Sequence, residues 1–228
     1  MEVIEIEAEL FRLIPSRFPP VHVFEGLVAN DRLDEVAAAE TRTNPRIIAE
    51  ERLKAKGGGS SHRFQNFNHA PFKYTNPDGS VFFPPFRPAL ELADCRQTAL
   101  AIAVARRERF LRRTAEPPTG LDMRLLKTPI KGRFADFCHI DPDAARDERL
   151  KAAALIPTDV DGIIFRPAER KSHRCFAVLN GQILGHTLQT SHFRFWWDAN
   201  RIRTVYAFEN ATQWDAAILS NPADLLAA

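Results

Sequence analysis

Hydrophobic and polar residues alternate with two different periods along the chain, and the two periods predict different elements. Residues 3–14 alternate loosely between apolar and charged side chains and end at Pro15, which predicts an opening β-strand. Residues 100–111 carry apolar side chains at helical spacing and end in a run of arginines, which predicts a helix. Apolar spacing predicts another helix over residues 24–39, and Pro45 is placed to begin a further one.

The second half of the chain consists of short apolar runs separated by turn residues. Strands are expected over residues 123–130, 162–165, 175–179, 193–197 and 202–208, the last two forming a hairpin, and a short helix is expected over residues 146–155. Residues 62–88 are rich in Asn, Pro and Phe, which predicts strand pieces joined by tight turns. Short strands and helices without a regular βαβ rhythm predict an α+β fold, and without a linker between two cores residues 1–228 are expected to form a single domain.

Charge and cysteine content exclude several classes of protein. Lys and Arg number 31 against 29 acidic residues, so the net charge of +2 gives no reason to expect a nucleic acid or a membrane as partner. The acidic N-terminal segment and the lack of a long apolar run predict a cytoplasmic protein without a signal peptide. Cys95, Cys138 and Cys175 have no paired spacing, which favours a reducing compartment over disulfides or a zinc site. No metal ligand set and no bound cofactor are expected.

Six segments in order resemble those of the RES family. They are LFRLIPSRFPP, TNPRIIAE, NFNHAPFKYTNPDGS, TALAIAVARRERFL, EPPTGLDMRLL, and DGIIFRPAERKSHRCFAVLNGQILG followed by WWDANRI. The resemblance covers about residues 10–206 and leaves residues 207–228 as a C-terminal tail. It implies an ADP-ribosyltransferase-like fold with a split mixed β-sheet and a cleft for NAD as substrate. It also implies a bacterial toxin–antitoxin system, in which the toxin degrades NAD by hydrolysis or phosphorolysis or transfers ADP-ribose, and an Xre-type antitoxin blocks the cleft.

The residues that the family uses for this chemistry are largely replaced. The family has an arginine that holds the pyrophosphate, a tyrosine that stacks on a ring, and a glutamate and a serine near the ribose. At these positions the chain has Val81 for the arginine, Leu90 or Glu91 for the tyrosine, Ile102 for the glutamate, and Pro167 or Ala168 for the serine. Valine, isoleucine and proline cannot perform these tasks. Only Arg12 clearly matches a family arginine expected to face the cleft.

Two other segments offer candidate residues. In HRFQNFNHAPFKY, Arg63, Asn68 and Lys73 are predicted to bind a phosphorylated ligand, while His69 and Tyr74 are catalytic candidates for proton transfer and stacking. The alternative is that the polar residues of this segment satisfy turns.

In FRPAER, Arg166 and Arg170 are predicted to bind the ligand, and Glu169 is a catalytic candidate together with Glu91. The alternative for FRPAER is a surface ion pair. The basic run that ends the helix at residues 100–111 is interpreted as helix termination rather than as a binding patch.

Three functions remain open. The first is an NAD-consuming toxin or transferase that uses Arg12, Lys73, Tyr74 and a carboxylate from Glu91 or Glu169. The second is a catalytically silent RES domain that binds a nucleotide or a protein partner. The third is an enzyme that acts on another ligand in the same cleft. The family resemblance favours the first and the substitutions favour the others. The oligomeric state, including a homo-oligomer, is left open.

Overall fold

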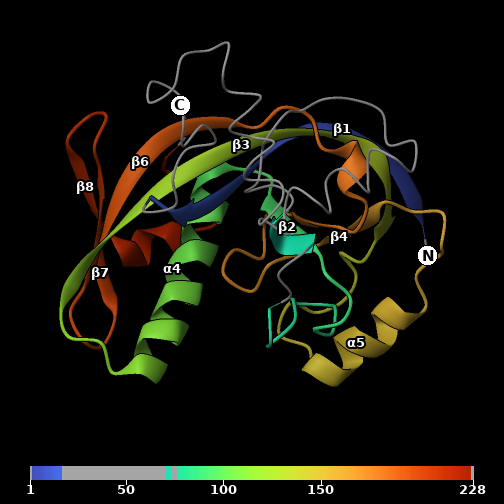
Figure 1. Cartoon of the computed structure of the whole chain (residues 1–228), viewed down its shortest axis with the longest axis horizontal. Coiled ribbons are helices and arrows are strands. Elements are labelled where there is room, and N and C mark those ends of the chain that lie inside the picture. Colours follow the sequence, from blue (N-terminus) through green and yellow to red (C-terminus); the bar gives the residue numbers. More distant parts are fainter. Residues whose placement is uncertain (1, 17–69, 73–75, 227–228) are drawn as a thin grey trace, which may run out of the picture.

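A mixed β-sheet spans the described part of the protein, and the helices α4 (Arg96–Thr114) and α5 (Arg146–Ala154) lie on one side of it (Figure 1). The computed structural model describes residues 2–16, 70–72 and 76–226, so the helices expected over residues 24–39 and after Pro45 lie outside the described residues. The strands are β1 (Val3–Pro15), β2 (Leu90–Ala93), β3 (Thr119–Asp136), β4 (Gly162–Phe165), β5 (Cys175–Val178), β6 (Leu188–Trp197), β7 (Ile202–Ala207) and β8 (Thr212–Asp215). The helices are α4 (Arg96–Thr114) and α5 (Arg146–Ala154), with 3-10 turns at Gly181–Ile183 and Ala216–Ser220.

The sheet divides into two wings along a pair of long strands. β1 runs antiparallel to β3 over its whole length, from Val3 opposite Ala135 to Pro15 opposite Met123. The first half of β3 pairs with β6, and β7 and β8 extend the sheet beyond β6. The end of β3 pairs in parallel with β4, and β5 and β2 extend the sheet on that side. β2 returns to β1 where Phe11 lies opposite Ala93. The predicted α+β fold with a split mixed sheet is thereby confirmed.

β3 is longer than the sequence pattern predicts. It continues on both sides of the predicted residues 123–130, through positions with charged side chains. Lys127 and Lys131 on β3 form ion pairs with Glu9 and Glu7 on β1, at 2.6 and 2.8 Å. Opposite charges on neighbouring strands stabilise an exposed pair of strands. The same charged residues interrupt the apolar pattern on which the strand prediction depends.

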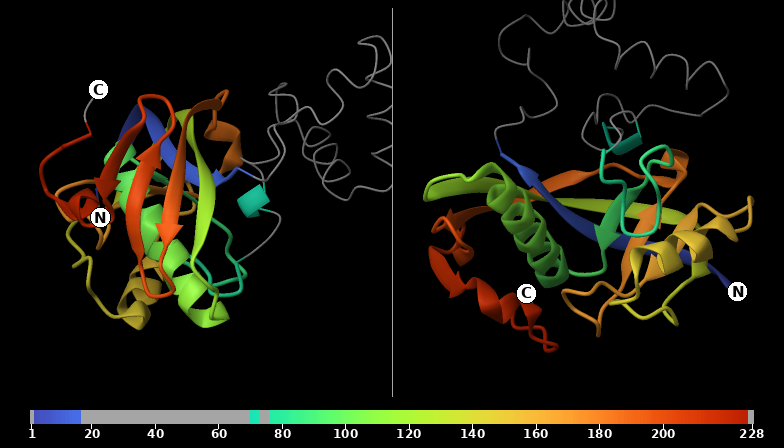
Figure 2. Two further views of the ribbon diagram at one scale, coloured as in Figure 1. Left: turned by 90° about the vertical axis from the view of Figure 1, so that its left-hand side faces the viewer. Right: turned by 90° about the horizontal axis from the view of Figure 1, so that it is seen from below.

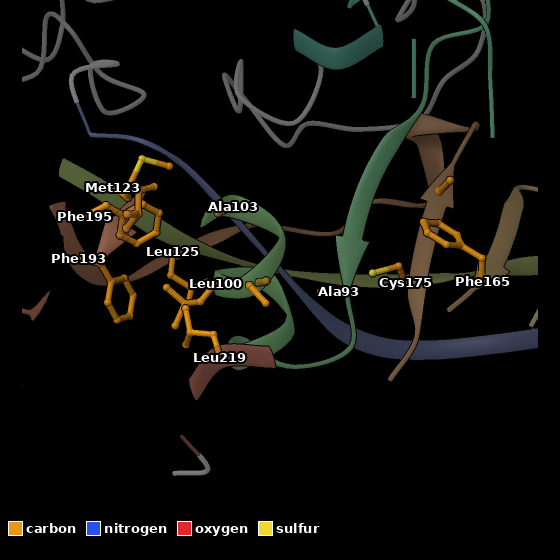
Figure 3. Close-up of a cluster of buried hydrophobic side chains, with 14 of the residues drawn as sticks. Ala93, Leu100, Ala103, Met123, Leu125, Phe165, Cys175, Phe193, Phe195 and Leu219 are labelled. Atoms are coloured by element: carbon orange, nitrogen blue, oxygen red, sulfur yellow. The ribbon is translucent and has the colours of Figure 1, made fainter. Parts of the chain in front are cut away.

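Alternate residues of the short strands face two separate hydrophobic cores. Ile164 on β4 and Phe176 on β5 belong to a core on one face of the wing formed by β1, β2, β5, β4 and β3. Ile163 and Ala177 face the other way, into the larger core beneath α4. Figure 3 shows this larger core, in which Leu100 and Ala103 of α4 lie with Leu125, Phe193 and Leu219. Such strands are buried on both faces, which explains their uninterrupted apolar runs.

α4 begins four residues before the predicted start because a cysteine caps it. The side chain of Cys95 accepts a hydrogen bond from the backbone N–H of Thr98. Cysteine is an unusual cap, so the sequence gives little sign of this boundary. Among the residues that the structure describes, no helix is long and apolar enough to cross a membrane.

The prediction for residues 62–88 is wrong over the part that can be checked. Residues 76–89 form turns rather than strand pieces, and residues 70–72 form a helical turn. The turn at Asn76–Pro77–Asp78–Gly79 is confirmed, because the Gly79 N–H donates to the Asn76 carbonyl at 2.8 Å. Gly79 has a φ of +71°, which favours glycine. The predicted C-terminal hairpin is also confirmed as β6 and β7, with Trp197 buried and Trp196 exposed.

Candidate functional site

A cleft with a volume of about 550 Å³ lies between α4, residues 76–89 and residues 165–169. Figure 2, right, shows residues 76–89 between α4 and α5. Arginines dominate its lining among the described residues: Arg12, Arg87, Arg106, Arg107, Arg109, Arg113, Arg146, Arg149 and Arg166. The same lining includes three carboxylates, those of Asp78, Glu91 and Glu169. The cleft therefore carries a positive charge, although the whole chain is nearly neutral.

One face of α4 supplies much of this charge. Ala99, Ile102, Arg106, Arg109 and Arg113 recur every three or four residues and line the cleft. This spacing is that of a single helix face. The interpretation of the basic run as helix termination is therefore incomplete, since four of its arginines line the cleft. The spacing of Arg106, Arg109 and Arg113 is visible in the sequence and would have predicted the cationic wall.

Glu91 holds three elements together at the floor of the cleft. One carboxylate oxygen accepts a hydrogen bond from the backbone N–H of Val81 at 2.9 Å, and the other forms an ion pair with Arg106. The Glu91 side chain is only 9% exposed. Burial lowers the pKa of Arg106, but the Glu91 charge outweighs it, so the pKa lies above its usual value. Because both oxygens are engaged, Glu91 is better placed to support the cleft than to act as a catalytic carboxylate.

Arg12 lies in the cleft, as the sequence predicts, and it stands near another cation. Burial and then repulsion by Arg106 lower the pKa of Arg12 to about 10. The side chain is still protonated at neutral pH. Two guanidinium groups that repel each other in a partly buried cleft would be stabilised by an anion between them.

Three other arginines of the cleft donate to backbone carbonyls. Arg87 donates to the Ala153 carbonyl at 3.3 Å, Arg146 to the Ser80 carbonyl at 3.3 Å, and Arg149 to the Pro142 carbonyl at 3.2 Å. These contacts fix the side chains but cancel no charge. In contrast, Arg113 pairs with the exposed carboxylate of Asp78 at 2.8 Å.

Glu169 differs from Glu91 in its surroundings. It lines the cleft beside Arg166, Pro167 and Ala168 and is half-buried. Among the residues described by the structure, its carboxylate makes no hydrogen bond and no ion pair. Of the carboxylates that line the cleft, this one is thus available to a ligand. Val81, Ile102 and Pro167, which the sequence comparison predicts at the positions of family residues, also line the cleft.

Arg170 does not reach the cleft. Its side chain is completely buried on the other side of the turn, where it donates to the Asn221 carbonyl at 2.9 Å and to the Thr98 hydroxyl at 3.0 Å. It also pairs with Asp224 at 3.0 Å. The Arg170 N–H donates to the Pro167 carbonyl and so closes a turn. In this turn the side chains of Glu169 and Arg170 point in different directions. This placement corrects the expectation that Arg170 binds the ligand.

The remaining candidates cannot be placed. Arg63, Asn68, His69, Lys73 and Tyr74 lie outside the described residues, so their roles stay predictions. The structure brings together Arg12, Glu91, Arg166 and Glu169 among the predicted residues. The sequence interpretation missed Arg87, Arg146 and Arg149, which come from segments too far apart in the chain to suggest one site.

Comparisons with known proteins place the chain in a family. The model of the RES domain matches residues 59–198. The chain is 52% identical over 212 residues to "Uncharacterized protein y4oC" of Sinorhizobium fredii, and the match covers 92% of each chain. It is also similar to a chain in the crystal structure of the M. tuberculosis MbcT–MbcA toxin–antitoxin complex. That match has 14% identity and a TM-score of 0.42 and covers 82% of this chain and 86% of the other. With a matching domain model over more than half its length, the chain belongs to the RES family, as its sequence motifs predicted.

Proposed function

We propose that the cleft binds a dinucleotide of the NAD class and that the protein consumes it by cleaving the bond between nicotinamide and ribose. The observation that carries this proposal is the concentration of nine arginines against three carboxylates among the described residues that line one cleft. A pyrophosphate is a ligand that such a surface selects, because guanidinium groups bind phosphate oxygens in pairs. Membership of the RES family supports NAD as the particular nucleotide.

Arg12 and Glu169 would have different tasks in this reaction. Arg12, next to Arg106, would hold the pyrophosphate. Cleavage leaves the bonding electron pair on nicotinamide and a positive charge on the ribose, which a carboxylate stabilises. Glu169 would supply that carboxylate, since its oxygens are not engaged by described residues. Water or phosphate then adds to the ribose carbon, and water gives up a proton to Glu169 as it does so.

A second candidate function is nucleotide binding without turnover. It is favoured by the apolar or rigid residues Val81, Ile102 and Pro167 in the lining and by the engaged carboxylate of Glu91. The arginines would then retain the ligand while the groups that promote its cleavage are missing.

We also propose a protein antitoxin as partner, of the Xre type that the family resemblance implies, covering the mouth of the cleft. The exposed aromatic side chain of Phe110 lines the cleft, and Phe86 is 86% exposed in the neighbouring turn. Exposed aromatic residues next to arginines are typical of protein interfaces.

The test is to incubate the purified full chain with NAD, with and without phosphate, and to measure the release of nicotinamide. We expect release by the unchanged protein and a loss of about 100-fold to 1000-fold in Glu169→Gln, with NAD affinity retained. Glu116→Gln, an exposed glutamate outside the cleft, is the matched control and should not change the rate.

The other outcomes discriminate between the two functions. Measurable NAD binding without nicotinamide release establishes the silent domain and rejects the enzyme. Absence of both binding and release rejects both functions.

A further inference from the structure

A second group of ligating side chains lies at the start of α4, outside the lining of the cleft. It consists of Asp94 and Cys95, which precede the helix, and His173, which precedes β5. His173 Nδ1 lies 3.3 Å from each carboxylate oxygen of Asp94 and 3.7 Å from Cys95 Sγ. The three ligating atoms lie within 4.8 Å of one another. Carboxylate, thiol and imidazole groups are the ligands that zinc prefers in proteins.

The two distances from His173 Nδ1 fit the edges of a tetrahedron around one metal ion. Zinc binds nitrogen and oxygen at about 2.0 Å and sulfur at about 2.3 Å, so tetrahedral neighbours are separated by about 3.3 Å for nitrogen and oxygen and about 3.5 Å for nitrogen and sulfur. The observed separations of 3.3 and 3.7 Å are close to these values. A zinc ion would therefore fit between the three side chains with small adjustments.

Asp224 orients the histidine for this task. Its Oδ1 lies 3.3 Å from His173 Nε2, whereas Asp94 contacts Nδ1, and the same oxygen lies 3.8 Å from Cys95 Sγ. A hydrogen bond from Nε2–H to a carboxylate leaves the lone pair of Nδ1 free to bind a metal. Carboxylates in this position are a regular feature of zinc-binding histidines.

Backbone groups fix the other two ligands. The Arg174 N–H donates to Asp94 at 2.8 Å, and the Thr98 N–H donates to Cys95 Sγ at 3.5 Å. The three side chains are thus held in place before any ion binds, which lowers the entropic cost of binding.

A divalent cation would match the charges around the group in its thiolate form. With Cys95 as a thiolate, the group contains three negative charges, on Asp94, Cys95 and Asp224. The guanidinium of Arg170, 3.2 Å from Cys95 Sγ and 3.0 Å from Asp224, neutralises one of them. A divalent ion would neutralise the other two.

We propose that Asp94, Cys95 and His173 bind one Zn²⁺ ion, with a water molecule in the fourth position. Through Asp224, the ion fastens the C-terminal segment to the start of α4 and to the turn before β5. This inference does not depend on the proposed function, because none of these residues lines the cleft.

The experiment uses Co²⁺ as a spectroscopic substitute for Zn²⁺ in the full chain after treatment with a chelator. We expect one equivalent to bind, with the visible bands of tetrahedral cobalt and a near-ultraviolet band from thiolate to cobalt, and Zn²⁺ to displace it. Cys95→Ser should remove the near-ultraviolet band. Asp224→Asn should weaken binding by about 10-fold to 100-fold. Cys138→Ser, a partly buried cysteine outside the group, is the matched control and should bind like the unchanged protein.

Since Cys95 caps α4, its replacement could prevent folding, and circular dichroism checks each variant. His173→Gln leaves the cap intact and decides the question if Cys95→Ser does not fold. The proposal is wrong if the unchanged protein binds no Co²⁺ at micromolar concentrations. It is equally wrong if His173→Gln binds as tightly as the unchanged protein, or if the thiolate band depends on Cys138.

Discussion

The turn between β4 and β5 separates the cleft from the site where Arg170 binds residues 221–224 of the C-terminal segment, and arginines on the two sides have opposite environments. Arg166 at the start of the turn lines the cleft and is exposed. Arg170, four residues later, is 0% exposed and all three of its nitrogen atoms donate hydrogen bonds. Its acceptors include the carbonyls of Asn221, Pro222 and Ala223.

This difference separates a structural arginine from a binding arginine. A buried guanidinium with every donor satisfied has no capacity left for a ligand, and its charge is matched by Asp224. The arginines of the cleft mostly donate to backbone carbonyls or stay exposed, so their charge is available to an anion. The type of residue is the same in both regions, and the acceptors around it decide the role.

The largest effect is expected for Arg170→Ala. The substitution leaves several buried carbonyls, the Thr98 hydroxyl and Asp224 without their donor, so the free energy of unfolding should fall by about 3–5 kcal/mol. Urea unfolding followed by circular dichroism measures the loss. Arg203→Ala, which breaks an exposed pair with Asp198, is the control and should lower the free energy of unfolding far less. Similar losses in the two variants would contradict a structural role for Arg170.

A smaller effect is expected for Glu91→Ala, because Glu91 belongs to the cleft but makes structural contacts. The change leaves the Val81 N–H and Arg106 without their acceptor and should lower the free energy of unfolding by about 1–3 kcal/mol. It also removes a negative charge from the cleft, so inorganic pyrophosphate should bind several times more tightly in a calorimetric titration. Glu7→Ala, an exposed ion-pair partner on β1, should change neither quantity. Weaker pyrophosphate binding in Glu91→Ala would show that Glu91 contacts the ligand.

The sequence predicts β1 and β3 to β7 but misses β2 and β8, and it predicts the directions of individual side chains less well. β4 matches its prediction at both ends because four consecutive apolar residues between turns leave little alternative. The family resemblance places FRPAER at the cleft and so predicts both Glu169 and Arg170 there. Side chains in a turn follow no regular period, so only the structure separates them. Cys95 and His173 are 78 residues apart, and no spacing rule joins them.

The helical wall of the cleft offers a matched pair of arginines with different directions. Arg109 lines the cleft, whereas Arg112 on the same helix donates to the Asn200 carbonyl at 3.0 Å and pairs with Glu108. Arg109→Ala should weaken pyrophosphate binding by about threefold to tenfold, because one exposed cation near phosphate contributes modestly. Arg112→Ala should leave the affinity unchanged. Equal losses in both variants would show that pyrophosphate binding depends on the overall positive charge and not on the arginines that line the cleft.

The smallest effect concerns the protonation of Arg12. Its pKa of about 10 lies below the ordinary 12.5, because burial and Arg106 disfavour the charged form in the folded protein. The unfolded chain therefore binds more protons between these two values, and the contribution of Arg12 to stability rises as the pH increases through about 10. A bound anion reverses the shift. Pyrophosphate binding near pH 10 should consequently take up a fraction of a proton, whereas binding at pH 7 should take up none through this group.

Calorimetric titrations in two buffers with different ionisation enthalpies measure that uptake directly. Arg12→Gln should abolish the uptake near pH 10, while Arg170→Lys, which keeps a cation outside the cleft, should retain it if it folds. Uptake that persists in Arg12→Gln would assign the proton to another group. The charge of Arg12 would then be compensated by the protein itself, like that of Arg170. Arg12 would be a structural arginine and not a binding arginine.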